Sequence, residues 1–443
     1  MKLWQKSKDA AAIVTQFTVG KDREMDAYLA AYDVLGSLAH VKMLEKIGLL
    51  TSKESAALCK ELKSIYQEIE KGDFPLRPEM EDIHSQVEWE LTKRLGEPGK
   101  KVHMARSRND QVLVDIRLFL RDEIEALVKQ VDTLFATFQA QSEKYKSFLL
   151  PGYTHLQLAM PSSFGLWFGA YAESLIDDCL QLQSAYQIVN KNPLGSAAGY
   201  GSSFPIDRTY TTQLLGFSQL NYNVVYAQMG RGKTERVVAQ ALSSVAETLA
   251  RFSMDACLYM NQQFGFISFP EEFTTGSSIM PHKKNPDVFE LIRSTCNRIK
   301  ALPNEILLMT ANLPSGYHRD LQLVKEHLFP AFQQLRDAIT LLQLMVTEIK
   351  IKENILEDKK YEHLFSVEKV NELVVQGVPF RDAYRQVGLS IENGTYSAPT
   401  NLNHTHEGSI GNLCTAQIAQ MMKEVQQGFT FEKAAKAKQA LLS

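Results

Sequence analysis

The sequence predicts an all-α protein of three helical domains, in which long helices form a central bundle. Residues 109–146 contain no glycine or proline, and their apolar side chains recur at steps of three and four, the period of one helix face. A helix of that length spans about 57 Å at 1.5 Å per residue, far more than is usual in compact domains. The same period returns in four later segments, while strand patterns are nearly absent.

The other long helices are expected in order along the chain. We expect them over residues 161–190 with Pro161 at the start, 233–262, 285–312 with a kink at Pro303, and 329–355. Five such helices between about residues 109 and 355 are typical of an elongated up-and-down bundle. Shorter helical segments precede and follow it, so we place the domains at residues 1–105, 106–355 and 356–443.

Composition excludes several classes of protein. The 443 residues are 44% apolar and 22% charged, as in an ordinary soluble protein. The 48 basic and 51 acidic side chains give a net charge of −3, which argues against a nucleic-acid binder. We find no apolar run long enough for a membrane span and no secretory signal, and five scattered cysteines favour the reducing cytoplasm. The ten histidines lack metal-ligand spacing, so we expect no metal.

Two connectors, residues 192–208 and 264–286, are long and rich in Gly, Ser and Pro, and loops of this kind are often functional. The second contains residues 276–287, Gly-Ser-Ser-Ile-Met-Pro-His-Lys-Lys-Asn-Pro-Asp. Two lysines and Asn285 precede an expected helix N-terminus, whose free N–H groups attract anions. Cations and backbone donors can hold a serine as an alkoxide, so Ser277 is a candidate base. A solvated surface loop would explain Gly-Ser-Ser alone but not the whole run.

These residues resemble the signature of the fumarase/aspartase superfamily, all-α lyases that release fumarate. Residues 107–112 (Ser-Arg-Asn-Asp-Gln-Val) resemble the hallmark of its argininosuccinate lyase branch. Further matches follow in family order at residues 81–84 (Glu-Asp-Ile-His), 151–157 (Pro-Gly-Tyr-Thr-His-Leu-Gln), 317–325 and 378–381 (Val-Pro-Phe-Arg).

The resemblance implies reversible elimination of argininosuccinate to L-arginine and fumarate in arginine biosynthesis, without cofactor or metal. Such a reaction removes a proton beside a carboxylate and needs a base, an acid and cations for the developing charge. By resemblance, the catalytic residues are Ser277 (base), His155 (candidate acid or proton shuttle), Lys283, and Glu290, which hydrogen-bonds to His155. The substrate-binding residues implied are Thr154, Arg108, Asn109, Asn285, Tyr317, Gln322, Lys325 and His84.

Other interpretations stay open at single positions. His84 could be a satisfied buried histidine, Glu290 a helix-surface carboxylate, and Lys325 a solvated lysine. The sequence also departs from the family: His282 stands where glutamine is usual. Gly20 stands near the usual place of a substrate-binding serine, so we assign no residue there.

The resemblance further implies a homotetramer in which each active site draws on three chains. The motifs lie at widely separated points along helices of about 57 Å, which favours sites shared between chains. Two other functions remain to be distinguished: a different fumarate-releasing lyase such as adenylosuccinate lyase, and a non-catalytic structural protein like the related lens crystallins. The first lacks support from a basic patch for a nucleotide phosphate. The second would not need all four catalytic residues.

Overall fold

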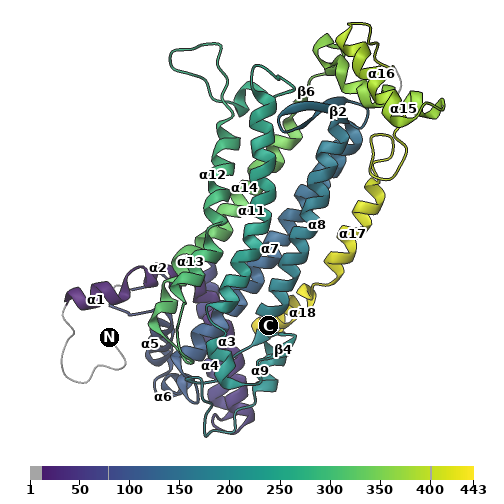
Figure 1. Ribbon diagram of the computed structural model, residues 1–443. Coiled ribbons are helices and arrows are strands. Elements are labelled where there is room, and N and C mark those ends of the chain that lie inside the picture. Colours follow the sequence, from purple (N-terminus) through teal and green to yellow (C-terminus); the bar gives the residue numbers. More distant parts are fainter. Residues whose placement is uncertain (1–11, 78, 400–401) are drawn as a thin grey trace.

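The computed structural model describes residues 12–77, 79–399 and 402–443 and shows a long helical bundle with smaller groups of helices at its two ends (Figure 1). The bundle helices are α7 (Arg108–Lys144), α8 (Phe164–Val189), α11 (Lys233–Met260), α12 (Asp287–Ile299) and α14 (Val324–Glu348). A short helix, α13 (Leu302–Met309), follows α12 after a break beside Pro303, where the sequence predicts a kink. The fold is mostly helical with long helices, as predicted.

Helix α7 matches its predicted extent most closely, and its 37 residues span about 54 Å. It begins with a capping box, in which the Ser107 hydroxyl oxygen accepts the Asp110 N–H and the Asp110 carboxylate accepts the Ser107 N–H. Its apolar stripe is fully buried, and α7 packs against α8 and α14. The stripe comprises Leu120, Ile124, Leu127, Val131 and Leu134.

Two predicted helix starts are wrong. Pro161 belongs to strand β2 (Gln157–Ser163), which pairs antiparallel with β1 (Leu149–Thr154), and α8 begins only at Phe164, where the Ser163 hydroxyl caps Leu166 N–H. Helix α14 begins at Val324, five residues before the predicted position, and contains Pro330 within it. The two strands of this hairpin are too short to show a clear alternating pattern, so the sequence pattern of the adjacent helix α8 was extended over them.

The remaining elements lie before, between and after the bundle helices. Toward the N-terminus lie α1 (Ala12–Val19), α2 (Asp22–Asp26), α3 (Ala30–Lys46), α4 (Ser52–Glu70), α5 (Ile83–Leu95) and α6 (Glu97–Lys100). Between the bundle helices lie α9 (Arg208–Leu214) and α10 (Val224–Met229), and after them α15 (Ser366–Val375), α16 (Phe380–Glu392), α17 (Thr415–Gln427) and α18 (Phe431–Leu442). Strand β3 (Lys191–Asn192) pairs parallel with β4 (Gln219–Leu220), and β5 (Ile267–Ser268) pairs antiparallel with β6 (Lys350–Ile351).

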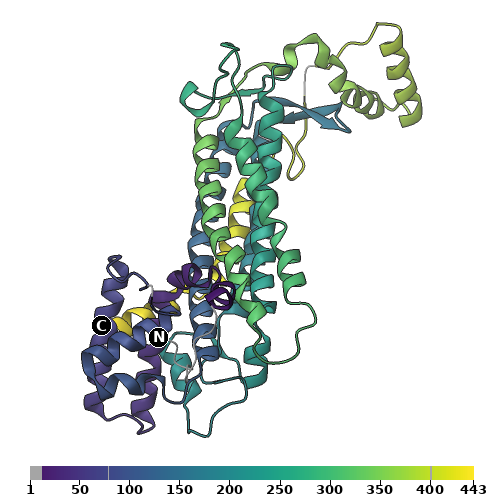
Figure 2. The same ribbon diagram turned by 90° about the vertical axis from the view of Figure 1, so that its left-hand side faces the viewer.

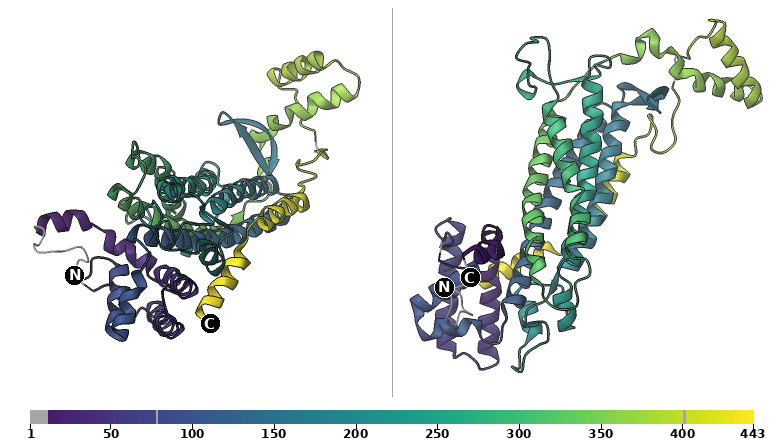
Figure 3. Two further views of the ribbon diagram at one scale, coloured as in Figure 1. Left: turned by 90° about the horizontal axis from the view of Figure 1, so that it is seen from below. Right: turned by 60° about the vertical axis from the view of Figure 1, so that its left-hand side comes forward.

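Within the described ranges, the buried apolar residues gather in three clusters. The largest fills the bundle, the second joins α3, α4 and α5 to the start of α7, and the third is a small core of α15 and α16, the pair that stands off the top of the bundle in Figure 3. Helix α17 returns along α8, with Met422 in the bundle core. Helix α18 ends beside α3, with Leu441 in the second cluster (Figure 2). The predicted domain boundaries near residues 105 and 355 remain a prediction.

In the part of the chain that the structure describes, no helix combines the length and the apolar character needed to cross a bilayer.

Candidate active site

The motif of residues 107–112 lies at the start of α7, at the lower end of the bundle. Asp110 is buried, and while one of its oxygens accepts the Ser107 N–H, the other accepts the N–H groups of Gly195 and Ala197, each at 2.9 Å. Burial raises the pKa of Asp110 to about 6, although these backbone hydrogen bonds oppose the shift. Asp110 therefore anchors the glycine-rich connector to α7, next to Arg108, the first residue of the helix.

Arg108 is held by three neighbours. Its Nε lies 3.3 Å from an Asp82 oxygen, and its two terminal nitrogens donate to Gln111 (2.7 Å) and to Ser85 (3.1 Å). Gln111 in turn donates to Asp33 at 2.6 Å. This chain of contacts fixes the plane of the guanidinium group, which suits it to a carboxylate ligand.

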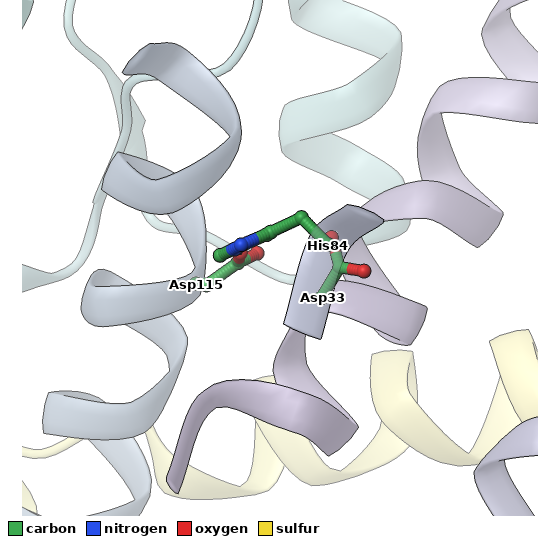
Figure 4. Close-up of side chains that lie close together, drawn as sticks. All are labelled: Asp33, His84 and Asp115. Carbon is green, nitrogen blue, oxygen red and sulfur yellow. The ribbon is translucent and has the colours of Figure 1, made fainter. Parts of the chain in front are cut away.

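Behind Arg108 lies a buried group of three titratable side chains, Asp33 from α3, His84 from α5 and Asp115 from α7 (Figure 4). Their potential ligand atoms lie within 4.8 Å of one another, and His84 Nε2 is 2.8 Å from an Asp115 oxygen. Burial and the charge of Arg108 would lower the pKa of His84. The hydrogen bond to Asp115 and the charges of Asp33 and Asp82 outweigh both effects and raise that pKa to about 9. A protonated His84 then supplies the positive charge between the two carboxylates. We interpret the group as an ion-pair network rather than a metal site.

A cavity of about 450 Å³ opens at this end of the bundle. Six of the predicted substrate-binding residues line it: His84, Arg108, Asn109, Tyr317, Gln322 and Lys325. His84 contributes only a fully buried ring directed at Asp115, as the alternative interpretation anticipated, so its contact with a substrate stays a prediction. The other five come from the start of α7 and from residues 317–325, two segments that the fold brings together.

Lys325 is not a solvated lysine. It is 4% exposed, and its ammonium lies 2.6 Å from a carboxylate oxygen of Asp22 and 2.6 Å from one of Asp26. Burial would lower its pKa, but the two aspartates outweigh burial and raise it, so the lysine stays charged. Asp22 and Asp26 were missed by sequence reasoning, because α2 carries no motif and the partners lie about 300 residues apart.

At the upper end of the bundle, Thr154 and His155 lie in the β1–β2 hairpin. Thr154 pairs with Gln157, so His155 and Leu156 form a two-residue turn, with φ of 54° and 59°. Both values are left-handed, and such a conformation costs a residue with a Cβ about 1–2 kcal/mol. Strain kept at an exposed tip points to a functional reason for presenting His155 there.

The connector between α11 and α12 carries Ser277, Lys283 and Asn285, also at the upper end (Figure 1). Its base is closed by Asn285, whose N–H donates to Thr275 at 2.8 Å and whose amide donates to Gly276 at 3.4 Å. The Ser277 oxygen accepts the N–H groups of Ile279 (3.3 Å) and Met280 (3.1 Å). Two backbone donors on one hydroxyl oxygen would also stabilise its alkoxide.

The chain does not bring all the predicted residues together. Ser277, Lys283, Asn285, Thr154, His155 and Glu290 lie at one end of the bundle, and the cavity lies at the other end of α7, about 54 Å away. Among the described residues, no hydrogen bond joins Glu290 to His155, and Glu290 is exposed at the start of α12. In a single chain the predicted site residues therefore form two separate groups, which we call the upper and the lower half-site of the predicted active site.

Known proteins share both the sequence and the fold. The model of a family described as Lyase matches residues 6–301. An argininosuccinate lyase of Bacteroides fragilis is 58% identical over 441 residues, which cover 100% of this chain and 99% of the relative. The chain belongs to the argininosuccinate lyase family.

A more distant argininosuccinate lyase and two solved structures also match this chain. The enzyme of Thermotoga neapolitana is 38% identical over 386 residues, 87% of this chain and 97% of that relative. Among solved structures, an EDDS lyase bound to formate superposes with a TM-score of 0.79 at 22% identity, covering 98% of this chain and 95% of that one. A class II fumarase from Schistosoma mansoni gives 0.72 at 16% identity, covering 94% and 95%. At these identities the two structures show a shared fold alone.

Proposed function

We propose that this chain catalyses the reversible cleavage of argininosuccinate to L-arginine and fumarate. The observation that carries the proposal is the environment of Ser277, whose oxygen accepts two backbone N–H groups on a loop that also bears Lys283 and Asn285. Ser278 lacks a comparable pair of donors among the described hydrogen bonds, which favours Ser277 as the base.

The chemistry follows from the charges that develop. Ser277 removes a proton from the carbon beside a carboxylate, and the electron pair moves into that carboxylate to give a doubly charged aci-carboxylate. Lys283 and Asn285 stabilise this charge, which is larger in the transition state than in the bound substrate. The carbon–nitrogen bond then breaks, and the departing guanidinium nitrogen takes a proton from His155 as the candidate acid. Glu290 orients His155.

We further propose that the site forms between copies of the chain, in a homotetramer. Argininosuccinate is far shorter than helix α7, which spans about 54 Å, so one substrate molecule cannot reach both half-sites of a single chain. Apolar side chains exposed at the upper half-site and on the bundle surface also favour association. Leu156 at the hairpin tip is 77% exposed, and Leu291 on α12 is 68% exposed.

Absorbance of fumarate at micromolar protein tests the activity directly, with argininosuccinate and adenylosuccinate compared side by side. Fumarate from argininosuccinate alone supports the proposal, fumarate from adenylosuccinate alone replaces it with the alternative lyase, and no fumarate from either supports a structural protein. Light scattering tests the assembly, and a stable, active monomer would contradict it. The five cysteines are free thiols, which fits the cytoplasm as the proposed location.

A further inference from the structure

The wall of the cavity beside Lys325 carries an excess of negative charge. Asp22 and Asp26 share this single lysine, at 2.6 Å each, so the three groups together carry a net charge of −1 when both carboxylates are ionised. Burial raises the pKa of Asp22, and the charge of Lys325 opposes this shift. Arg231, the next cation in the wall, is already paired with Glu235 at 3.2 Å. Asp26 is buried, but the Asp22 side chain is 24% exposed and lines the cavity. Asp22 is thus the carboxylate of this pair that a ligand can reach, and a cationic ligand beside it would favour its ionised form.

A cation without a carboxylate partner lies next to this wall. Arg319 donates to the Gln322 side chain and to the Thr18 backbone oxygen, both neutral, and it forms no ion pair with any described carboxylate. Gln322 also bonds to the backbone of Thr18 and Val19, a few residues before Asp22. These contacts hold Arg319 and Asp22 on adjoining segments of one cavity.

We propose that Asp22 and Arg319 form a clamp for the amino-acid end of the substrate, in which Asp22 binds the α-ammonium group and Arg319 binds the α-carboxylate. A carboxylate placed against Lys325 would meet a lysine that two aspartates have neutralised, whereas an ammonium group there restores the charge balance. The inference deepens the proposed function, on which the identity of the substrate rests. It makes the cavity selective for a free α-amino acid.

Two analogues of arginine separate the two contacts without adding bulk. 5-Guanidinopentanoate lacks only the α-ammonium group, and agmatine lacks only the α-carboxylate. Calorimetric titration of the full-length protein with each analogue and with arginine requires no turnover. A charge-assisted contact is strong enough to change the affinity by about tenfold to a hundredfold, so arginine should bind at least that much more tightly than either analogue.

Single substitutions in the clamp should also distinguish the ammonium contact from the carboxylate contact. Asp22→Asn should lose the preference for arginine over 5-guanidinopentanoate and keep the preference over agmatine, while Arg319→Gln should do the reverse. Glu24→Gln is the matched control, because it removes the same charge from an exposed position of the same helix α2. It should change neither preference.

The outcomes that overturn the clamp are distinct from those that overturn the activity. Equal binding of arginine and 5-guanidinopentanoate by the unaltered protein rejects it, even if a variant fails to fold. Loss of the ammonium preference in Glu81→Gln but not in Asp22→Asn also rejects it, since Glu81 is another acid of the same cavity. A protein that releases no fumarate from argininosuccinate but discriminates as described keeps the clamp and loses the proposed function.

Discussion

Two inactive variants of this chain should restore each other's activity when they assemble together. Ser277→Ala removes the base from the upper half-site, and Arg108→Gln disables the cavity about 54 Å away along α7. If each site takes its loop from one chain and its cavity from another, every site in either pure variant is defective. In an equal, random mixture half of the loops and half of the cavities are intact. About a quarter of the sites then combine two intact halves.

The assay is fumarate absorbance after the two variants are expressed together, with the single variants as baselines. We expect about a quarter of the specific activity of the unaltered protein, from the statistics of mixing. Ser277→Ala combined with Lys283→Met is the control: both changes lie on the same loop, so mixing leaves every site defective and nothing should be recovered. No recovery in the first mixture, with mixed assemblies demonstrated, would mean that each site forms within a single chain.

The remaining predictions concern single residues. Ser277→Ala should lower turnover by about 10²–10⁴-fold with little effect on substrate binding, and Ser278→Ala should not; the opposite result in steady-state kinetics would show that we chose the wrong serine. Glu290→Gln and His155→Asn should each lower the rate, and the double variant should lose far less than the product of the single losses, because one residue acts through the other; independent effects would exclude that orientation. The raised pKa of His84 means that the folded state binds its proton more tightly than the unfolded chain does. This contribution to stability, at most about 3 kcal/mol, is complete below pH 6.5 and is lost as the pH rises through about 9. Urea unfolding between pH 6 and 10 measures it, and His84→Gln should flatten that part of the profile.

The long helices were predictable because their side chains repeat a local period. Residues 109–146 were expected and α7 occupies Arg108–Lys144, since a buried stripe at steps of three and four needs no partner to be recognised. The β1–β2 hairpin was not predictable in this way, because its seven-residue strand merges into the pattern of α8 and its turn lacks the glycine or asparagine that usually marks one.

The residues of the candidate site also differ in whether the sequence alone could identify them. Arg108, Lys325 and Ser277 were identified from short motifs with a recognisable resemblance. Asp22 and Arg319 could not be, because their importance depends on a lysine and a backbone oxygen that only the tertiary structure brings close. A pairing across about 300 residues leaves no pattern in one sequence.

The position of α18 sets the order in which the protein can fold on the ribosome. Leu441 packs in the same cluster as Val34 and Leu38, and Gly216 lets the helix approach closely, since a Cβ there would lie 2.7 Å from Ala437. At 5–20 residues per second, synthesis of these 443 residues takes roughly 20–90 s. For almost all of that time the N-terminal helices lack the last piece of their core. The nascent chain therefore exposes apolar surface until α18 has been made, and removal of α18 should cause aggregation rather than a merely shortened protein.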